Sequence, residues 1–307
     1  MIKRRKDTQK SKWRYWRNLI SAFFVIMLIG LLIIFYIVLP IRYAEAIAQP
    51  NRAPVCCVTP ADLGFNYEIV SFITMDGLTL RGWYIPSKNK AAIIISHGIG
   101  GNRMNCLAQG VALATHGYGV LLIDLRAHGE SDGNKVFFGG NDIVAAADYL
   151  KHRDDVDPNK IGAMGVSLGG LVTIQAAAID KEIRVVVADG SAPNTIQDLP
   201  MPVMIGHWLD LPFKGVSFLI WNLEGVTAPL STIEAIKRIA PRPILLIAGT
   251  QSEFEREMQR KLYAAAGEPK QLWEVTDAGH AGNWNAEPDE YEKRIVLIFN
   301  QALLGGE

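Results

Sequence analysis

Hydrophobic and polar positions divide the chain into two parts. The first part contains an unbroken apolar segment from Leu19 to Leu39 that carries no charged residue. From about residue 67 onward, short apolar runs alternate with longer segments whose apolar residues recur every three or four positions. The first pattern predicts a helix that is apolar on all its faces, and the second predicts strands that alternate with helices.

The alternation predicts a mostly parallel sheet with helices on both faces. It opens with two β-rich runs, Tyr67–Thr74 and Leu78–Ile85, which are joined by a strong hairpin signal at Asp76-Gly77. Further strands are predicted at Ala91–Ser96, Gly119–Asp124, Lys160–Val166, Ile183–Asp189, Pro243–Gly249 and Gln271–Thr276. Helices are predicted at Arg103–His116, Gly140–Lys151, Leu168–Ile179, Ser231–Ile239, Phe254–Ala266 and Pro288–Leu304. This order implies right-handed crossovers and a doubly wound α/β fold with an antiparallel hairpin at its edge.

One interval interrupts this rhythm, between the strands that end at Asp189 and begin at Pro243. A structureless loop of that length is improbable in a compact domain, so we expect a short cap at about 192–228, over the carboxyl ends of the strands. Its apolar side chains are candidates for the lining of an acyl pocket: Met201, Met204, Trp208, Phe213, Phe218 and Trp221. The alternative is that they only pack the cap onto the domain, or face a membrane or a partner.

The segment from Leu19 to Leu39 is long enough to span a bilayer, which takes roughly 20 residues. Many basic residues precede it, against one acid, Asp7: Lys3, Arg4, Arg5, Lys6, Lys10, Lys12, Arg14 and Arg17. Basic residues flank a span on its cytoplasmic side, so we expect residues 1–18 in the cytoplasm, a transmembrane helix at 19–39, a proline-rich extended linker at 40–64 and an extracytoplasmic α/β domain at 65–307.

A cleaved signal peptide is the competing interpretation of this segment. Ala44-Glu45-Ala46 resembles a cleavage site. The apolar run is nevertheless longer than the roughly 7–15 residues of a usual signal peptide, which favours an uncleaved anchor. Both interpretations place the α/β domain outside the cytoplasm.

Composition narrows the possible functions. The formal net charge is zero, which gives no case for nucleic-acid binding. The three cysteines, Cys56, Cys57 and Cys106, show no metal-ligand spacing, and the chain has neither a P-loop nor a dinucleotide-binding motif. We therefore expect no metal and no cofactor. Cys106 is expected to be an ordinary buried residue, with pairing to Cys56 or Cys57 as the alternative.

The strand at Lys160–Val166 leads into the pattern Gly-x-Ser-x-Gly, formed by Gly165, Ser167 and Gly169. A serine on a sharp strand-to-helix turn sits in a strained backbone conformation that exposes its hydroxyl. Large side chains two residues on either side would collide across the turn, so both positions need glycine. The N–H groups at the start of the following helix favour developing negative charge.

Four stretches together resemble the α/β-hydrolase superfamily, and most closely its prolyl-oligopeptidase-like, monoglyceride-lipase-like and serine-aminopeptidase-like branch. They are the Gly165–Gly170 turn, the loop His97-Gly98-Ile99-Gly100, the stretch Tyr118–Ser131, and the loop Asp277-Ala278-Gly279-His280. The resemblance covers about residues 67–304 and implies the α/β-hydrolase fold. It also implies that Ser167 is a nucleophile and His280 its general base, in the chain order serine, acid, histidine.

The acid is where the chain departs from the family. The family usually has aspartate three residues after the glycine that ends the strand before the acid loop, and that position here is Ser252. Glu253, next to it, is the preferred candidate, followed by Glu255 and then Asp277. Its role is to fix the histidine tautomer and stabilise the imidazolium. The alternative for the two glutamates is that they are ordinary acids at the start of a helix.

The resemblance also implies an oxyanion hole made of the backbone N–H groups of Leu168 and Ile99. His97 is expected to shape the backbone of its loop rather than act as a base. A polar group after the fourth strand is expected to tie that loop near the oxyanion site: Asp124, Arg126, His128 and Ser131.

The resulting prediction is a membrane-anchored serine hydrolase that cleaves an ester, thioester or small amide, with an apolar acyl group, through an acyl-enzyme on Ser167. One alternative is a non-catalytic binding or scaffold protein of the same fold at the membrane, which the missing aspartate motivates. The other is an acyltransferase that uses the same triad.

Overall fold

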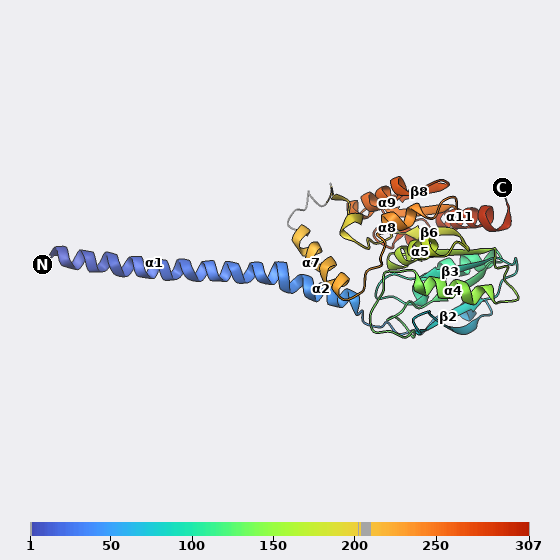
Figure 1. Cartoon of the computed structure of the whole chain (residues 1–307), viewed down its shortest axis with the longest axis horizontal. Helices are drawn as coiled ribbons and strands as arrows, with labels where there is room; N and C mark the ends of the chain where they lie inside the picture. Colours follow the sequence, from blue (N-terminus) through green and yellow to red (C-terminus); the bar gives the residue numbers. More distant parts are fainter. Residues whose placement is uncertain (1, 202, 204–209, 307) are drawn as a thin grey trace.

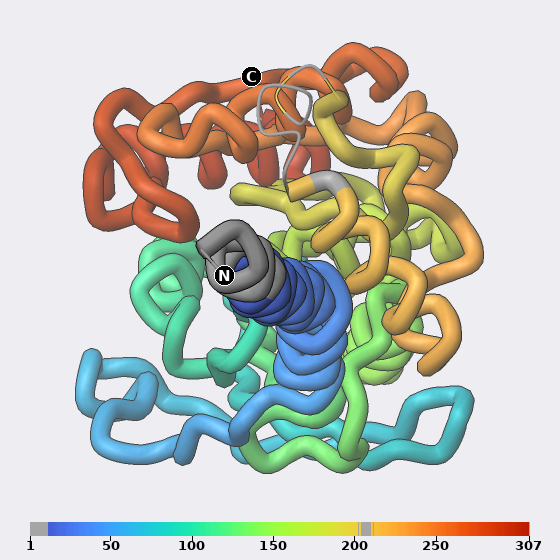
Figure 2. The backbone as a smooth tube through the Cα atoms, turned by 90° about the vertical axis from the view of Figure 1, so that its left-hand side faces the viewer, coloured from blue at the N-terminus to red at the C-terminus, as the bar shows by residue number. Residues whose placement is uncertain are grey.

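The computed structural model describes residues 2–201, 203 and 210–306 of the chain. A long N-terminal helix projects from an α/β domain (Figure 1). The helix leaves the domain from the side on which helix α7 (Asp210–Leu223) lies (Figures 1 and 2). The predicted Met204 and Trp208 of the cap lie outside the described residues.

Within the described residues, eight strands form one sheet, as predicted, in the order β1-β2-β4-β3-β5-β6-β7-β8. The strands β1 and β2 pair antiparallel, β2 also pairs antiparallel with β4, and the remaining neighbours are parallel. Their bounds are Glu68–Ile73, Thr79–Ile85, Ala92–Ser96, Gly119–Ile123, Ile161–Val166, Ile183–Asp189, Ile244–Gly249 and Lys270–Val275. The α/β-hydrolase fold expected from the sequence is confirmed.

Helices cover both faces of the sheet because the central strands are apolar on both faces. Along β3, Ile93 and Ile95 face one hydrophobic core, and Ala92 and Ile94 face the other. Helices α3 (Leu107–Thr115) and α11 (Pro288–Phe299) contribute to the first core. Helices contributing to the second core are α4 (Asn141–Lys151), α5 (Leu168–Ile179), α8 (Thr232–Lys237) and α9 (Glu253–Ala265). Shorter elements are the 3₁₀ helices Pro60–Leu63, Arg103–Cys106 and Ile196–Asp198, helix α10 (Asn283–Ala286) and the π-helix Asn300–Leu304.

The N-terminal helix is longer than the apolar segment. Helix α1 (Ile2–Ile33) continues through a π-helical turn, η1 (Ile34–Val38), into α2 (Leu39–Ala48). The extended linker that we predicted from residue 40 is therefore wrong for its first part. Pro40 follows directly on the π-helical turn η1, in which the N–H of Leu39 bonds the carbonyl of Ile34, and such a local change of helical geometry lets a helix continue past a proline.

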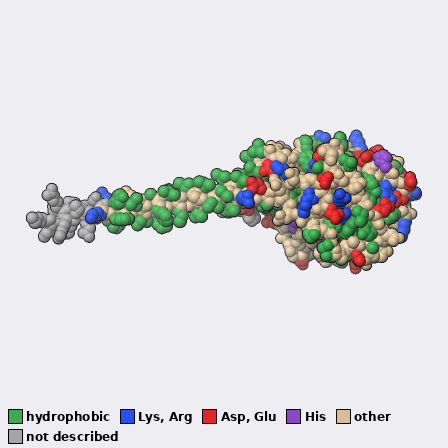
Figure 3. Space-filling view, turned by 90° about the horizontal axis from the view of Figure 1, so that it is seen from below, with side chains coloured by type: hydrophobic (Ala, Val, Ile, Leu, Met, Phe, Trp, Pro, Cys, Tyr) green, Lys and Arg blue, Asp and Glu red, His purple; other side chains and the backbone are tan. Residues whose placement is uncertain are grey.

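The stretch Lys12–Ala48 is long and apolar enough to cross a membrane, and its most apolar window is not covered by the rest of the protein. Apolar side chains line the helix over most of its described length, whereas the α/β domain shows charged side chains dispersed over its surface (Figure 3). By length and composition the helix fits either a membrane anchor or a signal sequence.

After α2 the chain continues across the domain in an extended path. The guanidinium of Arg52 donates to the carbonyls of His128, Gly129, Ser131 and Gly133, in the loop after β4. Cys106 is a buried thiol, as predicted, and Cys56 and Cys57 form a disulfide that was not anticipated from the sequence.

Candidate active site

The turn between β5 and α5 positions Ser167. The backbone of Ser167 has φ 57° and ψ −113°, a conformation that residues other than glycine rarely adopt. A Cβ on Gly165 would overlap the backbone of Gly169, and one on Gly169 would overlap the backbone of Ser96. The two glycines are therefore required by close backbone approach, as the spacing predicted.

Ser167, His280 and Glu255 form a chain of hydrogen bonds. The Oγ of Ser167 lies 2.9 Å from Nε2 of His280, and the other ring nitrogen, Nδ1, lies 2.5 Å from Oε2 of Glu255. The second carboxylate oxygen, Oε1, accepts a hydrogen bond of 2.8 Å from the backbone N–H of Gly249. This geometry allows His280 to take the serine proton while Glu255 holds the ring in the required tautomer.

The structure corrects the preferred position of the acid. Glu253 is exposed at the first position of α9, and Ser252 caps that helix by accepting a hydrogen bond from the N–H of Glu255. Glu255 lies two residues later, about 200° further round the helix, on the inner side of α9, where its side chain is only 5% exposed. Asp277, the third candidate, is exposed on the histidine loop.

Hydrogen bonding dominates the electrostatics of His280. The hydrogen bond that His280 donates to Glu255 raises the pKa of His280, and burial opposes that shift. A second carboxylate lies deeper in the site, since Asp189 is buried at the end of β6 and its carbonyl accepts a 2.7 Å hydrogen bond from the N–H of Ser167. Burial raises the pKa of Asp189 to about 6, although Tyr291 and Asn283 both donate to its carboxylate, at 2.8 and 2.6 Å.

The loop after β3 closely approaches the serine. A Cβ on Gly98 would lie 3.2 Å from the Cβ of Ser167, and Ile99 and Leu168 line the same pocket as Ser167. The N–H of Gly100 donates to Nε2 of His128 at 3.0 Å, so the loop after β4 holds the loop after β3, as predicted.

His97 lies in the core beside this loop. Its Nδ1 hydrogen-bonds the carbonyl of Gly98 at 2.7 Å, and its Nε2 accepts from the N–H of Leu125 at 3.2 Å. Burial lowers the pKa of His97 to about 3. A neutral, fully engaged imidazole shapes the loop and is unsuited to act as a base, in agreement with the sequence-based prediction.

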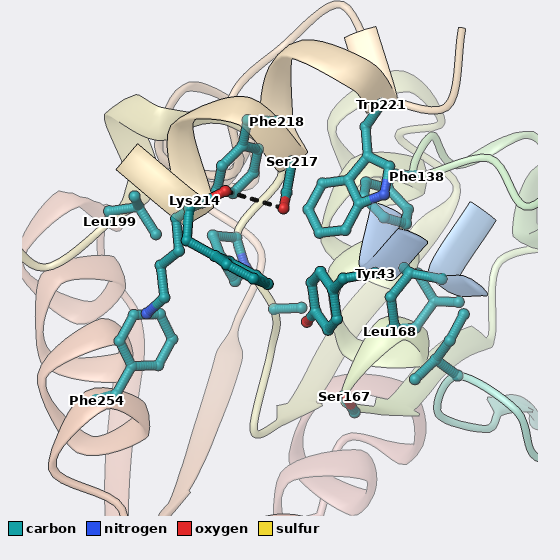
Figure 4. A pocket seen from close by; sticks show the side chains of 15 residues that line it. Tyr43, Phe138, Ser167, Leu168, Leu199, Lys214, Ser217, Phe218, Trp221 and Phe254 are labelled. Carbon is teal, nitrogen blue, oxygen red and sulfur yellow. Dashed lines mark hydrogen bonds between the residues drawn. The ribbon is translucent and has the colours of Figure 1, made fainter. Parts of the chain in front are cut away.

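An apolar pocket of about 290 Å³ opens beside Ser167 (Figure 4). Three of the predicted cap residues, Phe213, Phe218 and Trp221, line it from α7. Met201 is exposed instead. The remaining lining side chains, beyond Ser167, Ile99 and Leu168, are Tyr43, Ile47, Phe138, Ala192, Pro193, Leu199, Lys214, Ser217 and Phe254.

Tyr43 and Ile47 were not anticipated from the sequence, because prolines suggested a linker there. Figure 4 shows Tyr43 lying between Ser167 and the side chains of α7. A signal was present nonetheless: Tyr43, Ala44, Ile47 and Ala48 have the spacing of one face of a helix. Asp189, Tyr291 and Asn283 gave no comparable signal, since their contact depends on three separate elements meeting.

Comparison with known proteins agrees with this geometry. The model of the α/β hydrolase fold family matches residues 91–218. The polyketide transferase ATR5 of Stachybotrys chlorohalonatus is 38% identical over 294 residues, covering 77% of this chain and 97% of that protein. The uncharacterized protein YfhR of Escherichia coli K12 is 29% identical over 252 residues, covering 78% and 82%.

Among solved structures, the esterase Pf2001 of Pyrococcus furiosus superposes with a TM-score of 0.66 and 27% identity, covering 83% of this chain and all of the esterase. The chain belongs to the α/β-hydrolase fold family. Its esterase-like fold supports hydrolase activity.

Proposed function

We propose that the protein is a membrane-anchored serine hydrolase that cleaves a carboxylic ester, thioester or small amide through an acyl-enzyme on Ser167. The observation that carries the proposal is the hydrogen-bonded chain from Ser167 through His280 to Glu255. The serine hydroxyl alone is a weak nucleophile. His280 provides a base within reach of that hydroxyl, and Glu255 provides a carboxylate that orients the base.

The reaction follows from this arrangement. His280 Nε2 takes the proton of Ser167 as the hydroxyl attacks the carbonyl carbon, and the N–H groups of Leu168 and Ile99 stabilise the oxyanion. His280 then protonates the leaving alcohol, thiol or amine, which departs. Water, deprotonated by His280, attacks the acyl-enzyme, and His280 returns that proton to Oγ of Ser167 as the bond to the acyl group breaks and the acid is released.

The apolar lining of the pocket supports an apolar acyl group. The position of α2 supports an uncleaved membrane anchor over a cleaved signal peptide, because cleavage after Ala46 would remove Tyr43 from the pocket. It would also remove the carbonyl of Ala44, which accepts a 3.0 Å hydrogen bond from Nε1 of Trp221. We therefore propose an uncleaved anchor at Leu19–Leu39, with the N-terminus in the cytoplasm and the catalytic domain outside it.

Acyl transfer is the second candidate, because the relative ATR5 is named as a transferase. The same acyl-enzyme would then be attacked by an alcohol or amine instead of water. Product analysis with and without added alcohol acceptors separates the two: an acylated acceptor formed faster than free acid would favour transfer.

The central experiment is labelling of the full-length protein, in detergent, with a fluorophosphonate probe. A covalent adduct on Ser167, together with hydrolysis of p-nitrophenyl acetate that Ser167→Ala abolishes, is the expected result. A folded protein that neither reacts with the probe nor hydrolyses the ester would favour the alternative of a scaffold without catalytic activity.

A further inference from the structure

The helix that crosses the membrane also builds a wall of the substrate pocket, through Tyr43 and Ile47 of α2. We propose that the pocket takes a single fatty acyl chain directly from the bilayer, between α2 and α7, so that the substrate is a membrane-resident fatty acyl ester. This inference rests on the proposed function of Ser167.

The helix α2 is fixed to the domain by hydrogen bonds along its length. Besides the bond from Trp221 to Ala44, the Oγ of Ser217, whose hydroxyl donates to the carbonyl of Phe213 at 3.0 Å, lies 3.4 Å from the carbonyl of Pro40. At the end of α2, the carbonyl of Ala48 accepts from the N–H of Val136 at 2.9 Å. The wall made by α2 is therefore part of the folded domain and cannot be treated as a loose tether.

A continuous series of aromatic rings joins the apolar segment to the pocket. Phe35 lies within the predicted transmembrane span, and its ring centroid is 6.3 Å from that of Phe213 on α7. The Phe213 ring is 5.6 Å from that of Tyr43, and Tyr43 is 6.1 Å from Trp221. Because Phe213, Tyr43 and Trp221 all line the pocket, its wall continues onto a surface that the bilayer covers.

The depth of the pocket relative to the membrane follows from helix geometry. Tyr43 lies four residues after Leu39, the end of the apolar segment, which is roughly 6 Å along a helix. The headgroup layer on each side of the hydrocarbon core is about 5–7 Å thick. Tyr43 therefore lies at headgroup depth, where tyrosine is favoured. An acyl chain that leaves the hydrocarbon core beside Phe35 meets the pocket without crossing bulk water.

The volume of the pocket limits how many acyl chains of a substrate can enter it. At about 290 Å³ it lies at the lower end of the range for ligand pockets, and apart from Lys214 its lining consists of apolar and hydroxyl side chains. This space suits one acyl chain and excludes a two-chain lipid taken in whole. Each methylene that moves from water into it contributes about 0.8 kcal/mol.

The test measures the preference for chain length in full-length protein reconstituted into dioleoylphosphatidylcholine vesicles. The kcat/KM for p-nitrophenyl dodecanoate is divided by that for p-nitrophenyl acetate, and fluorophosphonate labelling of Ser167 counts the active sites in each preparation. We expect a ratio above about 10 for the wild type, since several methylenes are buried.

Ile47→Trp places an indole in the pocket and should lower this ratio at least about tenfold. The matched control is Ala46→Trp, which should keep the wild-type ratio, since Ala46 directly precedes Ile47 on α2 and is exposed. Ile47→Ala enlarges the pocket and should move the preferred chain length upward, which guards against a simple folding defect in Ile47→Trp.

The outcomes separate the two proposals. Equal ratios in Ile47→Trp and Ala46→Trp, or a labelled wild type that hydrolyses acetate without preferring the dodecanoate, would overturn the bilayer-derived acyl chain and leave the serine hydrolase standing. Absence of both labelling and hydrolysis in the wild type would instead refute the hydrolase proposal itself.

Discussion

Oε2 of the buried Glu255 lies 2.5 Å from Nδ1 of the half-exposed His280, which places a carboxylate behind the ring on the side away from Ser167. Replacing Glu255 by Gln keeps the shape of the side chain but removes its charge and favours the wrong tautomer of His280. We expect kcat/KM to fall by roughly 10²–10⁴. Ester hydrolysis per labelled active site measures the effect.

The control for this change is Glu253→Gln, two residues earlier on α9. Glu253 is exposed at the start of the helix, so its replacement should leave kcat/KM within about twofold of the wild type and cost at most a few tenths of a kcal/mol through the helix dipole. A large loss in Glu253→Gln with full activity in Glu255→Gln would return the acid to the position that the sequence favoured.

The pH dependence of activity should report the same contact. Glu255 raises the pKa of His280, and catalysis needs the neutral imidazole, so the acid limb of kcat/KM should lie above the usual histidine pKa of about 6.5. In Glu255→Gln the carboxylate that stabilises the imidazolium is lost, so the pKa of His280 should fall. The remaining activity should therefore reach its plateau at a lower pH. An acid limb that stays in place in this variant would contradict the assignment.

Asp189 should give the free energy of unfolding its own pH dependence. Its pKa is 3.8 in the unfolded chain and about 6 in the folded protein, so the folded state binds the proton more tightly. The stabilisation is complete below the unfolded pKa and is lost as the pH rises through about 6, by roughly 3 kcal/mol. Asp189→Asn should flatten this decline in urea unfolding curves measured in detergent between about pH 4 and 7. An unchanged decline in the variant would place its origin elsewhere.

A buried ion pair anchors the loop beside the oxyanion site. Arg103 and Asp124 are fully buried, 2.9 Å apart, and Asp124 also accepts hydrogen bonds from the N–H groups of Arg103 and Glu130, both at 2.8 Å. Asp124→Asn leaves the guanidinium without its buried counter-charge and should lower the free energy of unfolding by about 3–5 kcal/mol.

Glu130→Gln is the matched comparison for the buried pair. Glu130 also pairs with Arg103, but its side chain is 54% exposed, so the change should cost less than about 1 kcal/mol. Equal losses in the two variants would show that the partially exposed pair carries the stability of this loop.

The role of α2 in the pocket predicts an intact N-terminus. Full-length protein with a C-terminal tag should remain in the membrane fraction after alkaline carbonate extraction, with the mass of the uncleaved chain. In spheroplasts or right-side-out vesicles, protease added outside should digest the tagged domain. A soluble product that begins after Ala46 would contradict the anchor, and protection of the tag would reverse the orientation.

Local pattern was sufficient to predict the strands, the crossover helices and the turn that holds Ser167. A buried strand requires consecutive apolar residues, as in Ile93–Ile95, and the sharp turn requires Gly165 and Gly169; both requirements are visible in the chain itself. The helix α2 was missed because Pro40 was taken as a helix breaker, although a π-helical turn beside a proline lets a helix continue.

The local sequence pattern did not identify which glutamate contacts His280. Glu253 and Glu255 are both acids in the first turn of α9, and the family pattern, read by distance from the strand, favoured Glu253; only Glu255 shares a helix face with Met258 and Leu262. The choice depends on which face of α9 is turned toward β7 and the histidine loop, which is settled by the packing of Met258 and Leu262 into the core.

The sequence alone determined the alternation of strands and helices, the strained serine turn and an apolar segment of membrane-spanning length, because each depends on residues that are neighbours along the chain. The resemblance of its motifs to a family added the α/β-hydrolase fold and the order of Ser167 and His280. Only the tertiary structure decided that Glu255 meets His280, that Asp189 is buried beneath the serine, and that Tyr43 and Ile47 line the pocket. These relationships join segments that are far apart in sequence, and they depend on how whole helices and strands pack.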